Sequence, residues 1–246
     1  MVEQTPLDSL WAGTPAGEQT FDGGAGLPEP VRRYLGHAIA PGARLANAVR
    51  LRMHGEIKLG RWRPFDAEQV ISRTRGMIWT ARTRLFGLPV GGFDRFVDGH
   101  GEMRWKVLGI VPLMSASGPD IARSASGRLA AESMWLPPML SDPRVAWDTP
   151  AHRRIVAHVP CFGYDVAVTL TIGLDGRIEQ IAMQRWGNPG GGAFVEGAFG
   201  GIVEEERTFD GYTIPSRVRV GWHFGTERFD RDGEFFRGAI DQAAFK

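Results

Sequence analysis

The chain has 246 residues, 43% of them hydrophobic and 23% charged, and its formal net charge at pH 7 is +1. This composition excludes a disordered chain and a disulfide-stapled scaffold, and the balanced charge provides no global field that would attract nucleic acid or an anionic membrane. A chain of this length buries enough surface to fold around one core without a metal ion or disulfide.

The cysteine count and the hydropathy pattern indicate the cellular compartment of the protein. Cys161 is the only cysteine, so neither an internal disulfide nor a zinc site built from several thiolates can form. No apolar run approaches the roughly 20 residues that span a bilayer, and residues 1–21 lack a cationic start followed by an apolar stretch. We therefore expect a cytoplasmic protein with no stable membrane insertion.

The first predicted elements precede the main body of the chain. Residues 1–26 are rich in Gly, Pro and Thr and are expected to form an extended lead-in, from which Leu10 and Trp11 dock on the core. Apolar residues then recur at helical spacing over 28–38. This pattern predicts a short amphipathic helix, which we expect to close one end of the fold.

From residue 45 the apolar period switches to two, as in Val49, Leu51 and Met53 with polar residues between them. Such alternation is typical of a half-buried strand. Similar segments predict strands near residues 45–59, 65–73, 76–85, 92–98, 101–108, 152–160, 164–172, 177–186, 201–209, 213–223 and 226–237. Four Asp-Gly pairs, which favour tight hairpins between antiparallel strands, begin at Asp98, Asp175, Asp210 and Asp232.

One segment interrupts this rhythm, because apolar residues recur at helical intervals from Gly118 to Trp135. We expect this helix to place Ile121, Leu129 and Met134 in the core and to cover the apolar face of the sheet. The predicted fold is α+β and mainly antiparallel β, with a strongly curved half-barrel sheet wrapped around the central helix. Residues 27–246 are expected to form this single domain.

The sequence lacks the motifs of common catalytic centres. It has no phosphate-binding loop, no dinucleotide-binding glycine turn and no closely spaced pair of histidine ligands. Cys161, beside Pro160 and Phe162, is expected to be a small buried side chain rather than a nucleophile. We therefore expect no cofactor, no metal site and no covalent catalysis.

Two carboxylates set among aromatic residues are the candidate catalytic groups. Asp94 shares a predicted strand face with Phe96. If that face is the concave interior, desolvation would raise the pKa of Asp94, and the carboxyl group could act as a general acid or base. Pairing with an arginine is the equally open interpretation. Glu132 lies three residues before Trp135 on one helical stripe, and Arg185 is its expected partner. That pair could orient an acid in catalysis or simply fasten the helix to the sheet.

Tryptophan is abundant, with eight residues in the chain. Large rings with a single donor line pockets for lipophilic ligands well, although most are expected to lie in the core. The residues predicted to contact a ligand between the helix and the sheet are Trp79, Phe96, Trp105, Trp135, Trp186 and Trp222.

The segments Leu27–Leu35, Trp62–Phe65, Gly92–Gly101, Ala131–Pro138 and Val145–Trp147 resemble, in order and spacing, an uncharacterised bacterial family that carries no assigned activity. The resemblance covers nearly all of the chain after residue 26. It implies an antiparallel half-barrel around a helix, similar in outline to the periplasmic lipoprotein-carrier fold, whose concave side holds lipid. Many relatives begin with membrane-spanning residues, whereas this chain begins with a polar lead-in.

These observations leave two main hypotheses for function. In the first, the protein encloses a lipophilic or polycyclic small molecule and is a cofactor-independent enzyme of the cyclase, isomerase, lyase or hydrolase type, with Glu132 or Asp94 moving a proton while Arg185 stabilises charge. In the second, it is a passive carrier or sensor of a lipid-like ligand. Protein interaction through a sheet edge is the third possibility, and the oligomeric state is left open.

Overall fold

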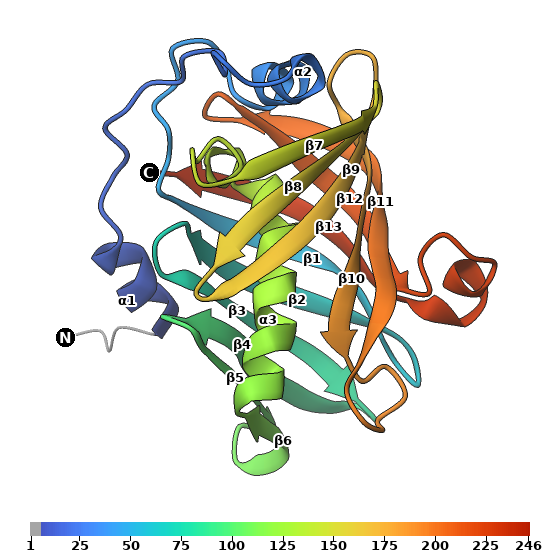
Figure 1. The fold of residues 1–246 in the computed structure, drawn as a ribbon. Coiled ribbons are helices and arrows are strands. Elements are labelled where there is room, and N and C mark those ends of the chain that lie inside the picture. Colours follow the sequence, from blue (N-terminus) through green and yellow to red (C-terminus); the bar gives the residue numbers. More distant parts are fainter. Residues whose placement is uncertain (1–5) are drawn as a thin grey trace.

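The computed structural model of the protein describes residues 6–246 and contains three α-helices within that range, namely α1 (Pro6–Gly13), α2 (Glu29–Ala38) and α3 (Pro119–Glu132) (Figure 1). The strands are β1 (Ala48–Leu59), β2 (Arg61–Ser72), β3 (Gly76–Leu85), β4 (Leu88–Val97), β5 (His100–Val107), β6 (Val111–Ser117), β7 (Ala146–Ala151), β8 (Arg154–Cys161), β9 (Tyr164–Ile172), β10 (Ile178–Gly187), β11 (Val195–Phe209), β12 (Tyr212–Trp222) and β13 (Glu234–Phe245).

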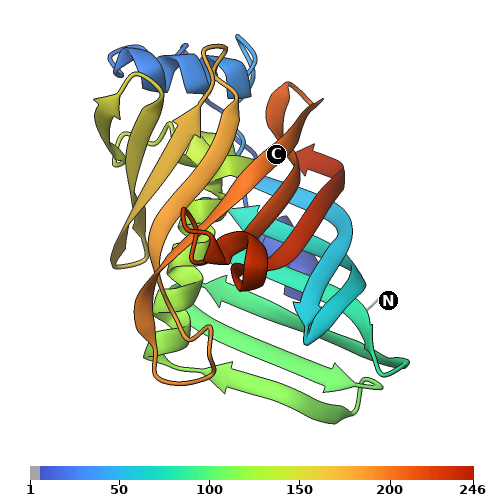
Figure 2. The same ribbon diagram turned by 90° about the vertical axis from the view of Figure 1, so that its right-hand side faces the viewer.

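All of these strands belong to one antiparallel sheet with the order β6-β5-β4-β3-β2-β1-β13-β12-β11-β10-β9-β8-β7. Neighbours are consecutive in sequence except β1 and β13, whose pairing sets Leu51 opposite Ala243 and joins the two halves of the sheet. The sheet bends strongly around α3 and leaves β6 and β7 as separate edges, as Figures 1 and 2 show. The expected α+β half-barrel around a central helix is therefore confirmed.

The position of α3 follows from its place between the two edge strands. The chain leaves β6 at Ser117, forms α3, makes short 3-10 turns at Ser133–Trp135 and Pro137–Met139, and enters β7 at the far edge. This crossing lies on the concave face, where α3 packs against β4 and β5 on one side and β9 and β10 on the other. Leu129 and Met134 are buried in the main core as expected, whereas Ile121 is only half-buried.

Two glycines allow α3 to approach the strands closely. A Cβ atom on Gly101 of β5 would lie 2.6 Å from the backbone nitrogen of Ala122, and one on Gly127 would lie 3.1 Å from Cε of Met183 on β10. The contact at Gly101 is with helix backbone, which cannot move aside as a flexible side chain can. The helix is therefore held at a distance from β5 that only glycine permits.

The other helices cover the outside of the half-barrel. Helix α2 closes one end, as expected, next to an isolated bridge between Ile39 and Tyr212. Helix α1 packs on β2 and β3, where Leu7 and Leu10 form a small second cluster with Val70 and Ile78. The lead-in was expected to be extended and instead contains this helix, although Leu10 docks as expected.

Other differences concern the predicted strands. The edge strands β6 and β7 were not predicted, and β13 begins at Glu234 rather than near residue 226. Apolar alternation is weak in both edge strands, since most of their residues are exposed on both faces. Three Asp-Gly pairs make hairpin turns, but Asp232-Gly233 ends a five-residue π-helical turn that starts at Phe229.

The close approach at Gly101 gives a stability prediction. In Gly101→Ala the new methyl group would lie 2.6 Å from the Ala122 backbone nitrogen, so α3 must shift away from β5. We expect the free energy of unfolding to fall by about 2 kcal/mol, measured by urea denaturation. Gly190→Ala is the control, because nothing lies within 4 Å of its added Cβ. Equal losses in both variants would show that the close approach is not the cause.

A second prediction concerns the contact between α2 and β11. His37 Nε2 lies 2.7 Å from Glu206 Oε2, and this hydrogen bond raises the pKa of His37 above 6.5 while partial burial opposes the rise. A raised folded-state pKa stabilises the protein below the unfolded value, so the contribution is complete below pH 6.5 and is lost as the pH rises through the raised pKa. The urea midpoint of the wild type should therefore fall as the pH rises from 6.5 through the raised pKa of His37. If His37→Gln shows the same fall, another group is responsible.

Candidate functional site

The inner face of α3 carries Arg128 and Glu132 one helical turn apart, and both side chains are largely buried. Arg128 Nε donates to Glu132 Oε1 at 2.6 Å, and Arg128 Nη1 donates to Asp94 Oδ2 of β4 at 2.9 Å. Opposite them, Gln69 Nε2 of β2 donates to Glu132 Oε2 at 2.5 Å. The helix is thus connected to two strands through one arginine and one amide.

Asp94 completes this network on the strand side. Its Oδ1 accepts a hydrogen bond from Trp105 Nε1 of β5 at 2.9 Å, and its Oδ2 accepts from Arg128. The Arg128 guanidinium also lies 5.0 Å from the ring centre of Trp79 on β3, within the range of a cation–π contact. Asp94 and Trp79 therefore hold Arg128 from two neighbouring strands, and Trp105 of β5 holds Asp94 in place.

Every carboxylate oxygen of Asp94 and Glu132 has a donor in this arrangement. Burial lowers the pKa of Arg128, but the charges of Glu132 and Asp94 and the hydrogen bonds they accept raise it further, so its pKa lies above the usual value. The group is permanently charged and donates hydrogen bonds to two carboxylates. The network therefore has the character of a structural bridge, one of the two interpretations open for these carboxylates in the sequence.

Arg185 of β10 lies on the other side of α3 and has a different environment. It is half-buried, and a Cβ atom on Gly127 would lie 3.6 Å from its Cγ, so its stem passes across the helix. The guanidinium lies 4.5 Å from the ring centre of Phe199 and 5.6 Å from that of Trp222. The buried Nε has no hydrogen-bond partner, and no carboxylate of residues 6–246 forms an ion pair with Arg185.

The expected pair between Glu132 and Arg185 is therefore wrong. Arg128, one turn away on the same helix, reaches Glu132 first and leaves Arg185 without a partner. Burial, followed by repulsion from Arg128, lowers the pKa of Arg185 to about 10, although the more distant charges of Glu132 and Asp94 partly oppose this. The group is still protonated at neutral pH. The site thus contains one satisfied cation and one unpaired cation, the second lying on aromatic rings.

Aromatic rings line the concave face on both sides of these arginines. One group connects Phe65, Trp79, Trp105 and Phe236, whose neighbouring ring centres lie 5.1 to 6.5 Å apart. In the second group Phe199 lies 5.2 Å from Trp222 and 6.3 Å from Phe235. Several of these rings are half-buried, so part of their surface is accessible to a ligand; these are Trp105, Trp222, Phe235 and Phe236.

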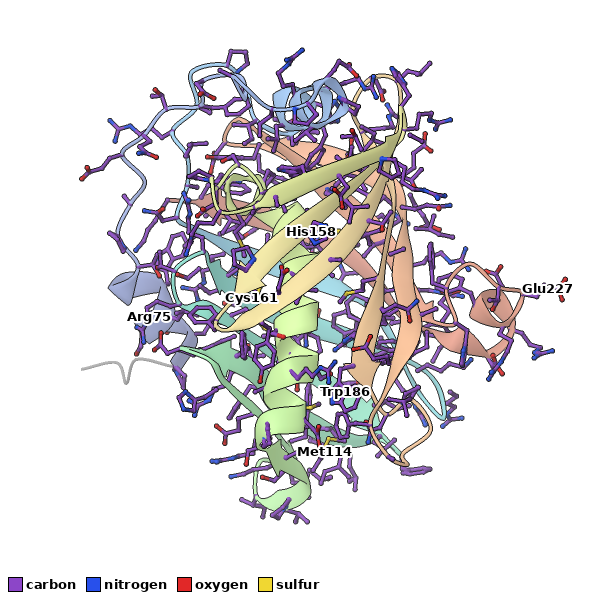
Figure 3. All side chains as sticks on the ribbon, in the orientation of Figure 1. Arg75, Met114, His158, Cys161, Trp186 and Glu227 are labelled. Carbon is purple, nitrogen blue, oxygen red and sulfur yellow. The ribbon has the colours of Figure 1, made fainter. Side chains whose placement is uncertain are left out.

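The remaining aromatic residues that were predicted to contact ligand lie elsewhere. Phe96 is fully buried against Phe162, and Trp135 is buried with its Nε1 donating to the carbonyl of Pro215 at 3.0 Å. Trp186 lies near the start of α3, where its Nε1 donates to Asp120 and the Arg123 guanidinium covers its ring (Figure 3). The structure thus brings Trp79, Trp105 and Trp222 to the arginines and places the other three apart from them.

Arg128 and Gln69 belong to the network but were not identified from the sequence. For Arg128 a signal was present, because it lies four residues before Glu132 on a predicted helix, the spacing of an ion pair. Gln69 gave no such signal, because only the fold brings it to Glu132.

Cys161 is buried as expected, and burial raises the pKa of its thiol to about 12, so it is protonated at neutral pH (Figure 3).

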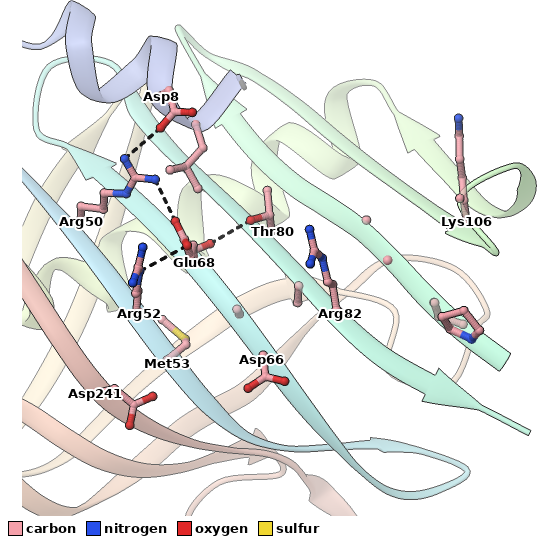
Figure 4. A pocket seen from close by; sticks show the side chains of 18 of the residues that line it. Asp8, Arg50, Arg52, Met53, Asp66, Glu68, Thr80, Arg82, Lys106 and Asp241 are labelled. Carbon is pink, nitrogen blue, oxygen red and sulfur yellow. Dashed lines mark hydrogen bonds and ion pairs between the residues drawn. The ribbon is translucent and has the colours of Figure 1, made fainter. Parts of the chain in front are cut away.

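A hollow of about 1130 Å³ lies on the outer face of β1 to β5 rather than beneath α3 (Figure 4). Its lining is strongly charged, and some of the charges pair within it: Arg50 binds Asp8 and Glu68, and Arg52 also reaches Glu68. The expected lipophilic pocket lined by tryptophans does not correspond to this hollow. The outer hollow offers a polar surface and contains none of the predicted site residues.

The network predicts a specific cost for removing its cation. Arg128→Met leaves Asp94 and Glu132 as buried charges without their counterion, so we expect the free energy of unfolding to fall by about 3 kcal/mol at neutral pH. Arg123→Met, which breaks the exposed pair with Glu196 on the same helix, is the control. Equal losses in Arg128→Met and Arg123→Met would contradict the electrostatic explanation.

Three solved structures share the outline of this fold at low identity. A domain assigned to outer membrane lipoprotein sorting, from Vibrio parahaemolyticus, is 8% identical over 81% of this chain and 86% of that chain, with a TM-score of 0.44. A DUF1329 family protein from Desulfovibrio piger is 11% identical over 82% and 86%, with a TM-score of 0.44. A LolA superfamily protein from Nitrosomonas europaea is 8% identical over 88% and 92%, with a TM-score of 0.45. Likeness at this level transfers no function.

The sequence itself matches a family of unknown function, DUF6920, over residues 25–245. No curated protein matches the chain. The matched range begins close to the end of the lead-in and includes the whole sheet, α3 and both arginines of the site. The chain therefore belongs to the DUF6920 family, as its resemblance to an uncharacterised family had indicated.

Proposed function

We propose that the protein is a non-catalytic carrier or sensor of an amphiphilic molecule with an anionic group and an apolar body. The observation that supports this proposal is the half-buried Arg185 guanidinium, which lies on Phe199 and Trp222 without a carboxylate partner. Arg185 would bind the anionic group, and the accessible faces of the aromatic rings would contact the apolar body.

The physical argument rests on the free energy of an unpaired charge. A guanidinium removed from water is unfavourable unless an anion or hydrogen-bond acceptors compensate it. Cation–π contacts with Phe199 and Trp222 offset part of this penalty but satisfy none of its N–H donors. The planar fork of donors matches a carboxylate, phosphate or sulfonate, and the low local dielectric strengthens such a pair.

The apolar part of the ligand follows from the surroundings of Arg185. Phe199, Trp222 and Phe235 form one aromatic surface beside it, and Met183 of the same strand adds a flexible thioether near Gly127. Rings of this kind supply large contact area with few polar atoms. Flexible methionine adapts to ligands of differing shape, as at other promiscuous apolar surfaces.

The alternative hypothesis of acid/base catalysis assigned proton transfer to Asp94 or Glu132. All four oxygens of these groups already accept hydrogen bonds from Arg128, Gln69 or Trp105. A general base needs a carboxylate oxygen within reach of the proton that it abstracts from substrate. Each oxygen keeps a second lone pair, but its donor holds the carboxylate in the bridge between α3 and the sheet. This structural role supports binding by Arg185 over proton transfer, and we therefore favour the carrier or sensor function.

The proposal predicts charge-selective binding. Titration with oleate and with oleyl alcohol, followed by tryptophan fluorescence, compares an anionic and a neutral amphiphile of matched chain. We expect Arg185→Gln to weaken oleate binding about tenfold and to leave oleyl alcohol binding unchanged. Arg177→Gln, which alters an exposed arginine one residue before β10, is the control and should bind both probes as the wild type does.

Other results would contradict the proposal. Unchanged oleate affinity in Arg185→Gln would show that the arginine does not bind the anion, and equal weakening for both probes would indicate a packing role. Urea denaturation of the same variant provides a check on folding. Because the substitution removes an unpaired half-buried charge, we expect its free energy of unfolding to equal or exceed that of the wild type.

A further inference from the structure

Three hairpin tips lie along one border of the sheet, on the β1 to β6 side. The register of β2 with β3 and of β4 with β5 brings the ends of these hairpins to the same border. The tips of β3–β4 and β5–β6 lie next to each other at the lower right of Figure 2. We define this border as the hairpin rim, formed by residues 58–63, 84–88 and 106–111.

The hairpin rim exposes large apolar side chains that have no intramolecular cover. The exposed fractions are 82% for Phe86, 75% for Ile110 and 53% for Leu108. Leu88, Val111 and Leu113 are also exposed. Met114 continues the surface along β6 (Figure 3). Scattered exposed apolar residues are ordinary, but a cluster of this kind marks an interaction surface.

The conformation of the tips adds an independent observation. Phe86 and Leu108 have positive φ angles of 51° and 54°, and each is followed by a glycine with positive φ. Asp98 and Asp210 hold the same position in other hairpins of this chain, and Asp is far better suited to it. Phe162, with a φ angle of 50°, packs on Phe96, whereas Phe86 and Leu108 have no such contact. The rim therefore retains strained apolar residues whose side chains face solvent.

The charge of the rim identifies the kind of partner. Segments 57–65, 82–93 and 103–119 contain no Asp or Glu, although the whole chain has 28 such residues and a net charge of only +1. The cations of the hairpin rim itself are Lys58, Arg61, Arg63, Arg84 and Lys106. The border is thus locally basic in a protein that is balanced overall.

We propose that the hairpin rim docks on an anionic lipid bilayer, with Phe86, Leu108 and Ile110 entering the interface and the basic side chains meeting the headgroups. Apolar insertion and attraction to anionic lipid combine in this way at peripheral membrane proteins. A second copy of the chain is a poorer partner, because two basic rims would repel each other. Pro112 and the bulge at Trp105 and Lys106 also make β6 a poor edge for strand pairing. The inference uses none of the residues of the Arg185 site.

Vesicle co-sedimentation tests the proposal with the full chain. We expect binding to phosphatidylcholine–phosphatidylglycerol vesicles, weaker binding to pure phosphatidylcholine, and a decrease with added salt. The double variant Phe86→Asn with Leu108→Asn should lower the partition coefficient about tenfold or more. Asn followed by Gly suits these positive-φ turns, so the variant keeps its fold, which circular dichroism can check.

The matched control is Leu174→Asn, which changes a side chain that is 73% exposed at the β9–β10 turn, next to Asp175 and away from the rim. Its vesicle binding should equal that of the wild type. Failure of the wild type to bind anionic vesicles, or equal binding by the double variant, would overturn the proposal. So would a wild-type dimer in sedimentation equilibrium that the double variant loses, since a second copy would then cover the rim.

Discussion

The crossing of α3 from one edge of the sheet to the other is the constraint on which the rest of the structure depends. Because β6 and β7 are the two edges, the chain between them must cross the sheet, and it does so over the concave face as a helix that satisfies its own backbone hydrogen bonds. The strands curve around it, and Gly101 lets the helix approach closely. What the concave face can bind is therefore decided by the residues that α3 brings to it.

Those residues distribute charge unequally. Arg128 and Arg185 face two carboxylates, so the charges balance as a sum, but geometry assigns both carboxylates to Arg128. The first cation fixes the helix to β4, and Gln69 adds β2. The second cation is left among aromatic rings, where an anion would be bound more strongly than in water. A structural bridge and a candidate binding site thus arise from the same burial of polar groups.

The concave site and the hairpin rim depend on different interactions: a half-buried cation among aromatic rings in the first, and exposed apolar and basic side chains in the second. Arg185 lies half-buried beside rings of the C-terminal half of the sheet, whereas the rim lies on the N-terminal half and is fully open. An amphiphile carrier that rests on a bilayer would have access to its ligand there. The sheet connects the two through β1 and β13, the pairing that unites its halves.

The sequence by itself determined the fold class, α2, α3 and most strands, because periodicity and Asp-Gly turns are local properties of the chain. It missed β6 and β7, whose exposed faces carry little alternation, and the helix within residues 6–13. It also pointed to Asp94, Glu132 and Arg185, but it paired Glu132 with Arg185, whereas the partner is Arg128. Only the tertiary structure decided that Arg128 forms ion pairs with both carboxylates and that Arg185 forms none, since pairing depends on distances between strands far apart in sequence.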